Sequence, residues 1–467
     1  MTETSGPAAP VVPEPSGSGA AEPAEERRRR IIRSYERLKS ASGPLPAEAP
    51  VITGSAVPAG PAADVCSHPI RLTGQITAVD RATGQSADMF KTWTEVEVPA
   101  APGFTETVKV DNPLYVDCGN RREEICPHCS QVYKRDARQV VLSGLSGGKG
   151  VPGSVAEHPC VFATFTAPSF GPVHARRERG GKVLPCRPRR DANKRACPHG
   201  RDISCNVRHC PDDPRLGRPM CPDCYQYDRA VVFNAGAPKA WQRFVTYLPR
   251  HLARAAGISV TRCRELVRPR FVKVAEYQAR GVIHYHAVIR LDANVKDPAA
   301  FAHPGSFWTA EHLKKAVELA AAQASALCPV PALGRSALVR FGPQTDVRVV
   351  RSGTETALSR EAVANYIAKY VTKAVGIPSL PATRIRHASE LPSLRCPAHH
   401  KRMIETALAL GYRRYAHQLG YGGHPITKSR RYSVTFGYVR RERAEYRKAQ
   451  RWPDGELDPW GRPLDER

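Results

Sequence analysis

The segment Phe271–Leu291, which reads FVKVAEYQARGVIHYHAVIRL, constrains the fold more than any other stretch of the sequence. Two apolar runs rich in β-branched residues flank Ala279-Arg280-Gly281. This pattern predicts a β-hairpin with a three-residue loop and with Gly281 in the left-handed conformation. A symmetric loop would place Glu276 directly opposite His284.

Three polar side chains of this hairpin are therefore expected to converge. Side chains alternate between the faces of a strand, so His284 and His286 share one face while Tyr285 points to the other. Facing Cβ atoms lie roughly 5 Å apart, which brings Glu276 to the same patch. One carboxylate and two imidazoles predict a metal site. A His-x-His pair in a strand is also common without any metal, so a second element has to support this interpretation.

The segment Ala362–Lys373, AVANYIAKYVTK, supplies that second element. Apolar residues recur every four positions, which predicts a helix with one buried stripe. Two Tyr-x-x-Lys units follow each other on this helix: Tyr366, Lys369, Tyr370 and Lys373. An amphipathic helix with two half-buried tyrosines is the alternative, and the segment taken alone favours it.

Together the two stretches resemble the HUH endonuclease superfamily of rolling-circle replication initiators, named for its His-hydrophobic-His motif. The resemblance includes Glu276, the pair His284 and His286, and the tyrosine helix downstream. Histidines that precede the tyrosines resemble the replication-initiator branch, since conjugative relaxases carry the tyrosine near the N-terminus. The run from Cys66 to Phe436 also looks like the plasmid replication initiators of actinobacteria.

The resemblance implies a metal-dependent DNA nicking-closing endonuclease. Glu276, His284 and His286 would hold a catalytic Mg²⁺ or Mn²⁺, and a tyrosine would attack the scissile phosphate to leave a 5′-phosphotyrosine and a free 3′-OH. Two alternatives remain open. One is a transposase with the same nuclease, and the other is a non-catalytic zinc-containing DNA-binding regulator.

The catalytic roles on the helix also follow from the resemblance. Tyr366 is the preferred first nucleophile because Asn365 and Lys369 make the closer match, and Tyr370 would serve a second cleavage. Lys369 and Lys373 would lower a tyrosine pKa or hold phosphate by charge.

The charge of the chain points to nucleic acid. A net charge of +26 over 467 residues indicates a polyanionic partner. The sequence shows no run of ~20 apolar residues and no signal peptide, so we expect a cytoplasmic protein that binds single- and double-stranded origin DNA rather than membrane. It also lacks a phosphate-binding loop, so a host helicase and a polymerase are the expected partners.

Composition predicts five parts. Residues 1–62 are rich in Ala, Pro, Gly, Ser and Glu and are expected to be a disordered arm. The other predicted parts are a zinc-binding module at 63–150, an endonuclease domain at 151–380 with a zinc-binding insertion at about 186–228, a basic DNA-binding region at 381–450 and a tail at 451–467.

Periodicity predicts the remaining elements of the endonuclease domain. We expect a strand over 160–167, a helix over 238–256 that begins at Pro238, a helix over 309–327 and a strand pair within 339–350. This order predicts an α+β fold built on an antiparallel sheet. The family resemblance implies that His284 and His286 lie on its central strand.

The 14 cysteines suggest zinc rather than disulfides, because they form Cys-x-x-Cys pairs with nearby histidines. One structural zinc site is predicted at Cys66, Cys118, Cys126 and Cys129. His68 and His128 compete for the fourth position.

A second structural zinc site is predicted in the insertion at Cys205, His209, Cys221 and Cys224. The spare candidates there are Cys197, His199 and Cys210. We interpret Cys396, His399 and His400 as surface residues.

Candidate DNA contacts are hydroxyl and basic side chains of the expected sheet, hairpin loop and C-terminal region. They are Thr164, Thr166, Arg280, Lys428, Arg430 and Arg431. The two threonines have the alternative of being ordinary sheet residues.

Overall fold

The computed structural model describes residues 66–79, 85–91, 93–101, 104–111, 114–188, 196–297, 301–350, 359–373, 380, 383–385 and 387–451. The predicted arm at 1–62 lies outside the described residues, as does the predicted tail after Arg451. The predicted boundaries at 150 and 380 stay predictions.

The predicted hairpin is confirmed. Strands β10 (Val267–Tyr277) and β11 (Ile283–Ala293) pair antiparallel, with Glu276 opposite His284. The Gly281 N–H donates to the Gln278 carbonyl at 2.8 Å, and Gly281 has φ +72°. Gly281 therefore adopts the left-handed conformation that the sequence predicts for it.

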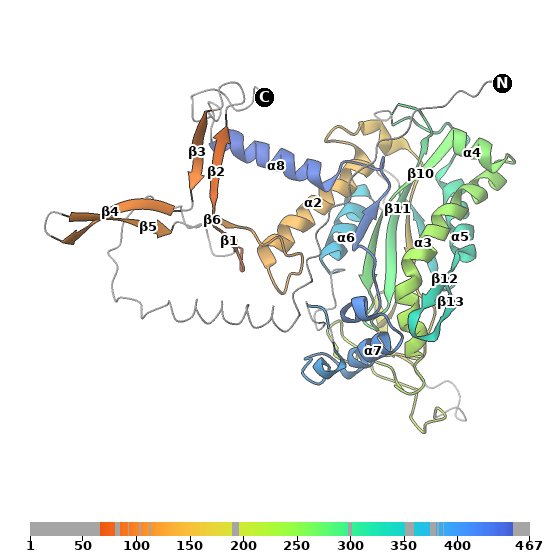
Figure 1. Ribbon diagram of the computed structural model, residues 1–467. Coiled ribbons are helices and arrows are strands. Elements are labelled where there is room, and N and C mark those ends of the chain that lie inside the picture. The colour runs from red at the N-terminus through yellow and green to blue at the C-terminus, as the bar shows by residue number, and fades with distance from the viewer. Residues whose placement is uncertain are drawn as a thin grey trace, which may run out of the picture. The chain divides into compact units, whose positions relative to one another are not determined.

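Strand β11 is the centre of a five-stranded antiparallel sheet in the order β14-β7-β11-β10-β15 (Figure 1). Its other members are β7 (Cys160–Phe165), β14 (Thr345–Val349) and β15 (Ile426–Lys428). The edge strand β15 comes from the C-terminal region, far along the chain from the hairpin that it joins. The α+β class and the central position of the histidine strand agree with expectation.

Helices cover both faces of this sheet (Figure 1). On one face, Phe165, Tyr285 and Ile289 lie in a core with α3 (Tyr227–Ala255) and α5 (Ala310–Gln323). On the other face, Phe162 and Val288 lie in a smaller core with α2 (Pro127–Ser146) and α6 (Arg360–Lys373). Since strand side chains alternate, the residues of even number on β11, including both histidines, face α2 and α6.

The described part of the chain contains further helices and strands. The helices are α4 (Val260–Leu266), α7 (Ala398–Ala409) and α8 (Phe436–Arg451). The two-stranded sheets join β1 (Ile70–Leu72) to β6 (Leu114–Val116), β2 (Gln75–Val79) to β3 (Ser86–Lys91), β4 (Trp93–Ala101) to β5 (Phe104–Asp111), β8 (Arg177–Arg179) to β9 (Lys182–Leu184), and β12 (Ser325–Val330) to β13 (Arg335–Arg340).

Three sequence predictions are corrected here. Helix α3 begins at Tyr227 rather than Pro238, because its earlier turns bury apolar residues that outweigh the interior proline. Helix α5 ends at Gln323, and the next residues pair with β13 as β12. Strands β13 and β14 do not pair with each other, since β14 pairs with β7. Tertiary pairing overrides local propensity in each case.

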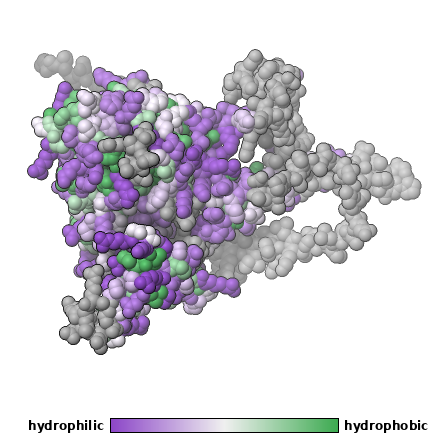
Figure 2. Space-filling model, turned by 180° about the vertical axis from the view of Figure 1, so that it is seen from behind, coloured by the Kyte–Doolittle hydropathy of each residue, from purple (hydrophilic) through white to green (hydrophobic). Residues whose placement is uncertain are grey.

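Hydrophilic side chains cover most of the face seen in Figure 2, and the apolar patches on it are small. Within the described part of the chain, no helix combines the length and the apolar character that a membrane span needs.

Asn234 on α3 ties the hairpin turn to its surroundings. Its side chain is fully buried, and its Nδ2 donates to the carbonyls of Gly281 and Leu419, each at 2.9 Å. Its Oδ1 accepts the Ile283 N–H at 2.9 Å. One amide thus satisfies three backbone groups that would otherwise be buried without partners.

We therefore predict that Asn234→Ala lowers the free energy of unfolding by about 2–4 kcal/mol, because it leaves these backbone groups unpaired in the core. Chemical denaturation followed by tryptophan fluorescence measures the effect. Asn294→Ala is the control. The Asn294 side chain donates an exposed hydrogen bond to the Arg264 carbonyl, so its removal should lower the free energy of unfolding by less than about 1 kcal/mol. Equal losses in the two variants would contradict the prediction.

Candidate functional site

The three side chains predicted to bind a metal do converge. The Nε2 atoms of His284 and His286 lie 2.8 and 3.1 Å from the same carboxylate oxygen of Glu276. The three ligand atoms lie within 4.8 Å of one another. Two imidazoles and one carboxylate on one side of an ion leave its other positions open to oxygen ligands.

Burial and hydrogen bonding prepare these groups to act as ligands. Burial lowers the pKa of His286 despite the nearby Glu276 carboxylate, so the imidazole is neutral over a wider pH range than usual. Burial opposes ionisation of Glu276, but hydrogen bonds from His284 and His286 outweigh it and lower the pKa of Glu276. A neutral imidazole and an ionised carboxylate are the forms that bind a cation.

Thr164 on β7 orients His286 from behind. Its Oγ1 lies 3.0 Å from the Nδ1 of His286, while the Nε2 of the same ring faces Glu276. The Phe162 ring stacks on the same imidazole with centroids 5.8 Å apart. Thr164 was predicted as a DNA contact, which stays a prediction, and its hydroxyl contacts a metal-ligand candidate. Thr166 follows the end of β7 and is partly exposed.

The predicted tyrosine helix lies over this cluster. The Tyr366 ring meets the His286 ring edge-on with centroids 5.1 Å apart, and it meets Phe162 at 5.5 Å. Tyr366 is 38% exposed, so its side chain is reachable from solvent. This contact joins the two motifs that lie far apart in the sequence.

Helix α6 is held by its apolar stripe and by α2. Val363 and Ile367 are buried in the core shared with the sheet. The Arg138 Nε of α2 donates to the Asn365 Oδ1 at 2.6 Å. Lys369 is exposed. Tyr370 and Lys373 belong to the same helix, but their side chains lie outside the described part.

Three of the predicted basic DNA contacts have partners within the chain. The Arg280 guanidinium donates to the carbonyls of Pro168 and Ala167 at 3.0 and 3.2 Å. Lys428 donates to the Ser433 carbonyl at 2.7 Å, and Arg431 donates to that of Val295 at 3.0 Å. These bonds fix loops of the protein, and contact of the three side chains with DNA stays a prediction. Arg430 is exposed.

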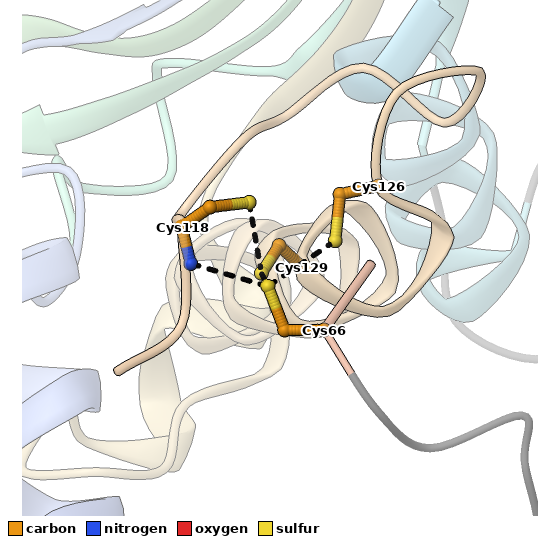
Figure 3. A group of neighbouring side chains, drawn as sticks. All are labelled: Cys66, Cys118, Cys126 and Cys129. Atoms are coloured by element: carbon orange, nitrogen blue, oxygen red, sulfur yellow. Dashed lines mark hydrogen bonds between the residues drawn. The ribbon is translucent and has the colours of Figure 1, made fainter. Parts of the chain in front are cut away.

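The first cysteine group assembles as predicted, with its four sulfur atoms turned toward a common centre (Figure 3). The sulfur of Cys66 lies 3.8 Å from that of Cys126 and 3.7 Å from that of Cys129, and the sulfurs of Cys118 and Cys129 are 3.7 Å apart. Zn–S bonds of ~2.3 Å place two tetrahedral sulfur ligands about 3.8 Å apart. Cys66 therefore fills the position for which His68 and His128 competed.

The predicted single site of the insertion is corrected to two groups. Cys205 and His209 lie with His174 and Cys186, whereas Cys221 and Cys224 lie with Cys197 and His199. Cys210 is exposed and belongs to neither group. Sequence spacing missed His174 and Cys186 because they lie well before the Cys-x₃-His motif.

The interpretation of His399 and His400 as surface residues is wrong. Both are buried, and their Nε2–H groups donate to the carbonyls of Arg280 and Ala279 at 3.0 and 3.3 Å. Burial lowers the pKa of His399 to about 4, so it stays neutral. Their function is to support the hairpin turn from α7.

Comparison with known proteins gives two matches. The family model described as "Replication initiator protein, pSAM2" (RepSA) matches residues 60–466. A curated replication initiator protein of Streptomyces ambofaciens is 38% identical over 396 residues, which cover 82% of this chain and 78% of that protein. No solved structure matches the chain.

The geometry predicts that Thr164→Val weakens Mn²⁺ binding by about 10–100-fold, because valine keeps the shape of threonine but cannot hydrogen-bond to His286. Titration of the purified protein with Mn²⁺, followed by electron paramagnetic resonance, measures the affinity. Thr166→Val is the control and should change it by less than about twofold, since no bond joins Thr166 to the cluster side chains. Unchanged affinity in Thr164→Val would refute the supporting role.

Proposed function

Because the chain belongs to the RepSA family of replication initiator proteins, we propose that it starts rolling-circle replication by nicking one strand of its origin DNA. The observation that carries this proposal is the contact between the Tyr366 ring and His286 of the Glu276, His284 and His286 cluster. A nucleophile candidate thus lies beside a candidate site for a cation that binds phosphate.

In the proposed reaction, Glu276, His284 and His286 would hold a Mg²⁺ or Mn²⁺ ion, as the resemblance to HUH endonucleases suggests. When bound, the ion supplies stabilisation of negative charge on the scissile phosphate. Thr164 would keep His286 in the orientation needed for ligation, because its hydroxyl can pair with Nδ1 while Nε2 faces Glu276.

The Tyr366 hydroxyl gives up its proton to solvent, and its oxygen attacks the phosphorus. A bond from phosphorus to the tyrosine oxygen forms, the bond from phosphorus to the 3′ oxygen breaks, and the 3′ oxygen takes up a proton from solvent. The 5′-phosphotyrosine conserves the phosphodiester energy, so resealing needs no nucleotide cofactor. The free 3′-OH can prime synthesis by a polymerase, with a host helicase to separate the strands.

Several further assignments belong to this proposal. Lys369, exposed and one turn from Tyr366, would attract phosphate by charge. Tyr370 would make the second cleavage that ends a cycle. The four cysteines at Cys66, Cys118, Cys126 and Cys129 would bind a structural Zn²⁺, and the protein would act in the cytoplasm.

Two other functions are consistent with some of the same observations. A transposase could use the same nuclease site, but the relatives are named as replication initiators. A regulator without catalysis would account for the charge and the cysteines, yet it gives no reason for Tyr366 to lie against His286. Replication initiation by nicking explains both observations together.

We predict that His284→Ala reduces nicking of single-stranded origin DNA at least about 100-fold, because one metal ligand is lost. Binding to duplex origin DNA should change by less than about twofold, since docking depends on phosphate contacts elsewhere. Denaturing electrophoresis of labelled DNA with Mn²⁺ measures cleavage.

His251→Ala is the matched control for this experiment. His251 lies on α3 across the sheet from the cluster and contacts Gln323 at 2.9 Å. If His284→Ala cleaves at the wild-type rate, the metal assignment is wrong.

The paired tyrosines give a separate prediction. Tyr366→Phe keeps the ring that contacts His286 and removes only the hydroxyl. If the tyrosines alternate, each single Phe variant still forms a covalent adduct with short single-stranded DNA, the double variant forms none, and neither single variant completes a cycle. Adducts are detected as protein bands that carry labelled DNA.

Tyr438→Phe is the control, because Tyr438 is exposed on α8 and is not proposed as a nucleophile. Alternation is refuted if Tyr366→Phe abolishes the adduct while Tyr370→Phe completes replication normally. Tyr370 would then be a packing residue with no role in cleavage.

A further inference from the structure

We propose that residues 174–224 bind two zinc ions at separate four-ligand sites, and that these sites hold a loop against the turn of the β10–β11 hairpin. The first site consists of His174, Cys186, Cys205 and His209. The second site consists of Cys197, His199, Cys221 and Cys224.

The first site has the spacing of a tetrahedral ion. The Nδ1 of His174 lies 3.3 Å from the Nε2 of His209, which is 3.6 Å from the Cys205 sulfur. Zinc bonds of ~2.3 Å to sulfur and ~2.0–2.1 Å to nitrogen place such ligand pairs about 3.4 and 3.6 Å apart. The arrangement therefore fits an ion at the centre of the four atoms.

A carboxylate behind His209 strengthens this assignment. The Nδ1–H of His209 donates to Asp213 at 2.7 Å, which leaves the Nε2 lone pair facing the other three ligands. Arg215 in turn bonds both oxygens of Asp213. A carboxylate that fixes the ring of a ligand histidine is typical of zinc sites.

The second site combines a Cys-x-x-Cys turn with His199 and Cys197. The Nδ1 of His199 lies 3.2 Å from the sulfur of Cys224 and 3.8 Å from that of Cys221. These two distances lie on either side of the roughly 3.6 Å expected for a nitrogen and a sulfur on one zinc ion. Four protein ligands leave no position for water, so the site is structural.

The segment has almost no apolar core of its own. In the described part of residues 174–224, the buried side chains other than ligands are limited to Pro219, with Gly217 beside it. The ligands Cys186, Cys197, Cys205, His209 and Cys221 are buried. A segment that buries little except metal ligands needs the free energy of metal binding in order to fold.

A short backbone path links the first site to the hairpin turn. The ligand His174 donates its N–H to the Arg218 carbonyl and accepts the Gly217 N–H, at 2.9 and 2.8 Å. Gly217, at φ +81°, lies so close to the turn that a Cβ there would sit 2.2 Å from the Ala279 carbonyl carbon. Only glycine permits this approach.

The second site reaches the same turn through α7. Asp223, between two of its cysteines, accepts a hydrogen bond from Arg402 of α7 at 2.9 Å. The Tyr225 ring, next to Cys224, packs edge-on against His399, with centroids 5.1 Å apart. His399 donates to the Arg280 carbonyl of the turn at 3.0 Å. Both sites therefore support the loop that sets Glu276 opposite His284.

Native mass spectrometry of the full-length wild-type protein tests the number of sites. We expect three zinc ions per chain, one for each cysteine-containing group. Two ions would overturn the proposal in favour of one shared site at Cys205, His209, Cys221 and Cys224. The measurement needs no DNA, so its outcome is independent of whether the protein nicks.

Cysteine variants then test which residues bind. Cys186→Ser with Cys205→Ser should lose one ion, and Cys197→Ser with Cys221→Ser should lose a different one. Cys210→Ser is the control and should keep all three, because Cys210 lies outside both groups. Loss of both insertion ions from either double variant, in protein that is otherwise folded by circular dichroism, contradicts separate sites.

Gly217→Ala tests the link to the turn without touching a ligand. It should keep three zinc ions but make the amides of Gln278, Gly281 and Ile283 exchange hydrogen about tenfold faster, because the added methyl displaces the turn. Gly180→Ala is the control, since Gly180 also has positive φ, at +56°, but meets no atom within 4 Å. Equal exchange in the two variants would overturn the supporting role.

Discussion

Backbone pairing between β10 and β11 sets the distance between one carboxylate and two imidazoles, and most other features of the site depend on it. A slip of one residue would send Glu276 to the opposite face of the sheet from its present partners. The turn that fixes this register is held by Asn234 from α3, by His399 and His400 from α7 and by Gly217 of the insertion. Four supports from three regions converge on one loop.

The two ends of β11 show why one polar cluster is chemically open and another is not. At the far end, Arg290 bonds both oxygens of Asp292, and His158 donates to the same carboxylate at 2.8 Å. Arg290 and Asp292 are buried and balance each other's charge, so removal of either would leave an uncompensated charge in the core. At the other end Glu276 and His284 are partly exposed, and Tyr366 lies at the edge.

Local pattern predicted the hairpin register and the helix at α6, because short turns and periodicity specify these features directly. The central position of the histidine strand was instead an implication of the family resemblance. The grouping of ligands in the insertion was not predictable in the same way. His174 joins Cys205 through contacts between distant loops, and no spacing rule separates Cys205 and His209 from Cys221 and Cys224. The buried state of His399 and His400 likewise depends on the turn of a hairpin over a hundred residues earlier.

The cysteine groups also divide between the two halves of the candidate site. Cys126 and Cys129 lie at the start of α2, which packs along α6, and α6 carries Tyr366. The groups of the insertion are instead proposed to support the turn between the strands that carry Glu276 and His284. The proposed nucleophile and the proposed metal ligands thus lie on separate elements, each with its own anchor. Since in-line attack on a phosphate tolerates little misplacement, rigid anchors on both halves would keep Tyr366 and the proposed metal ligands in register during the proposed reaction.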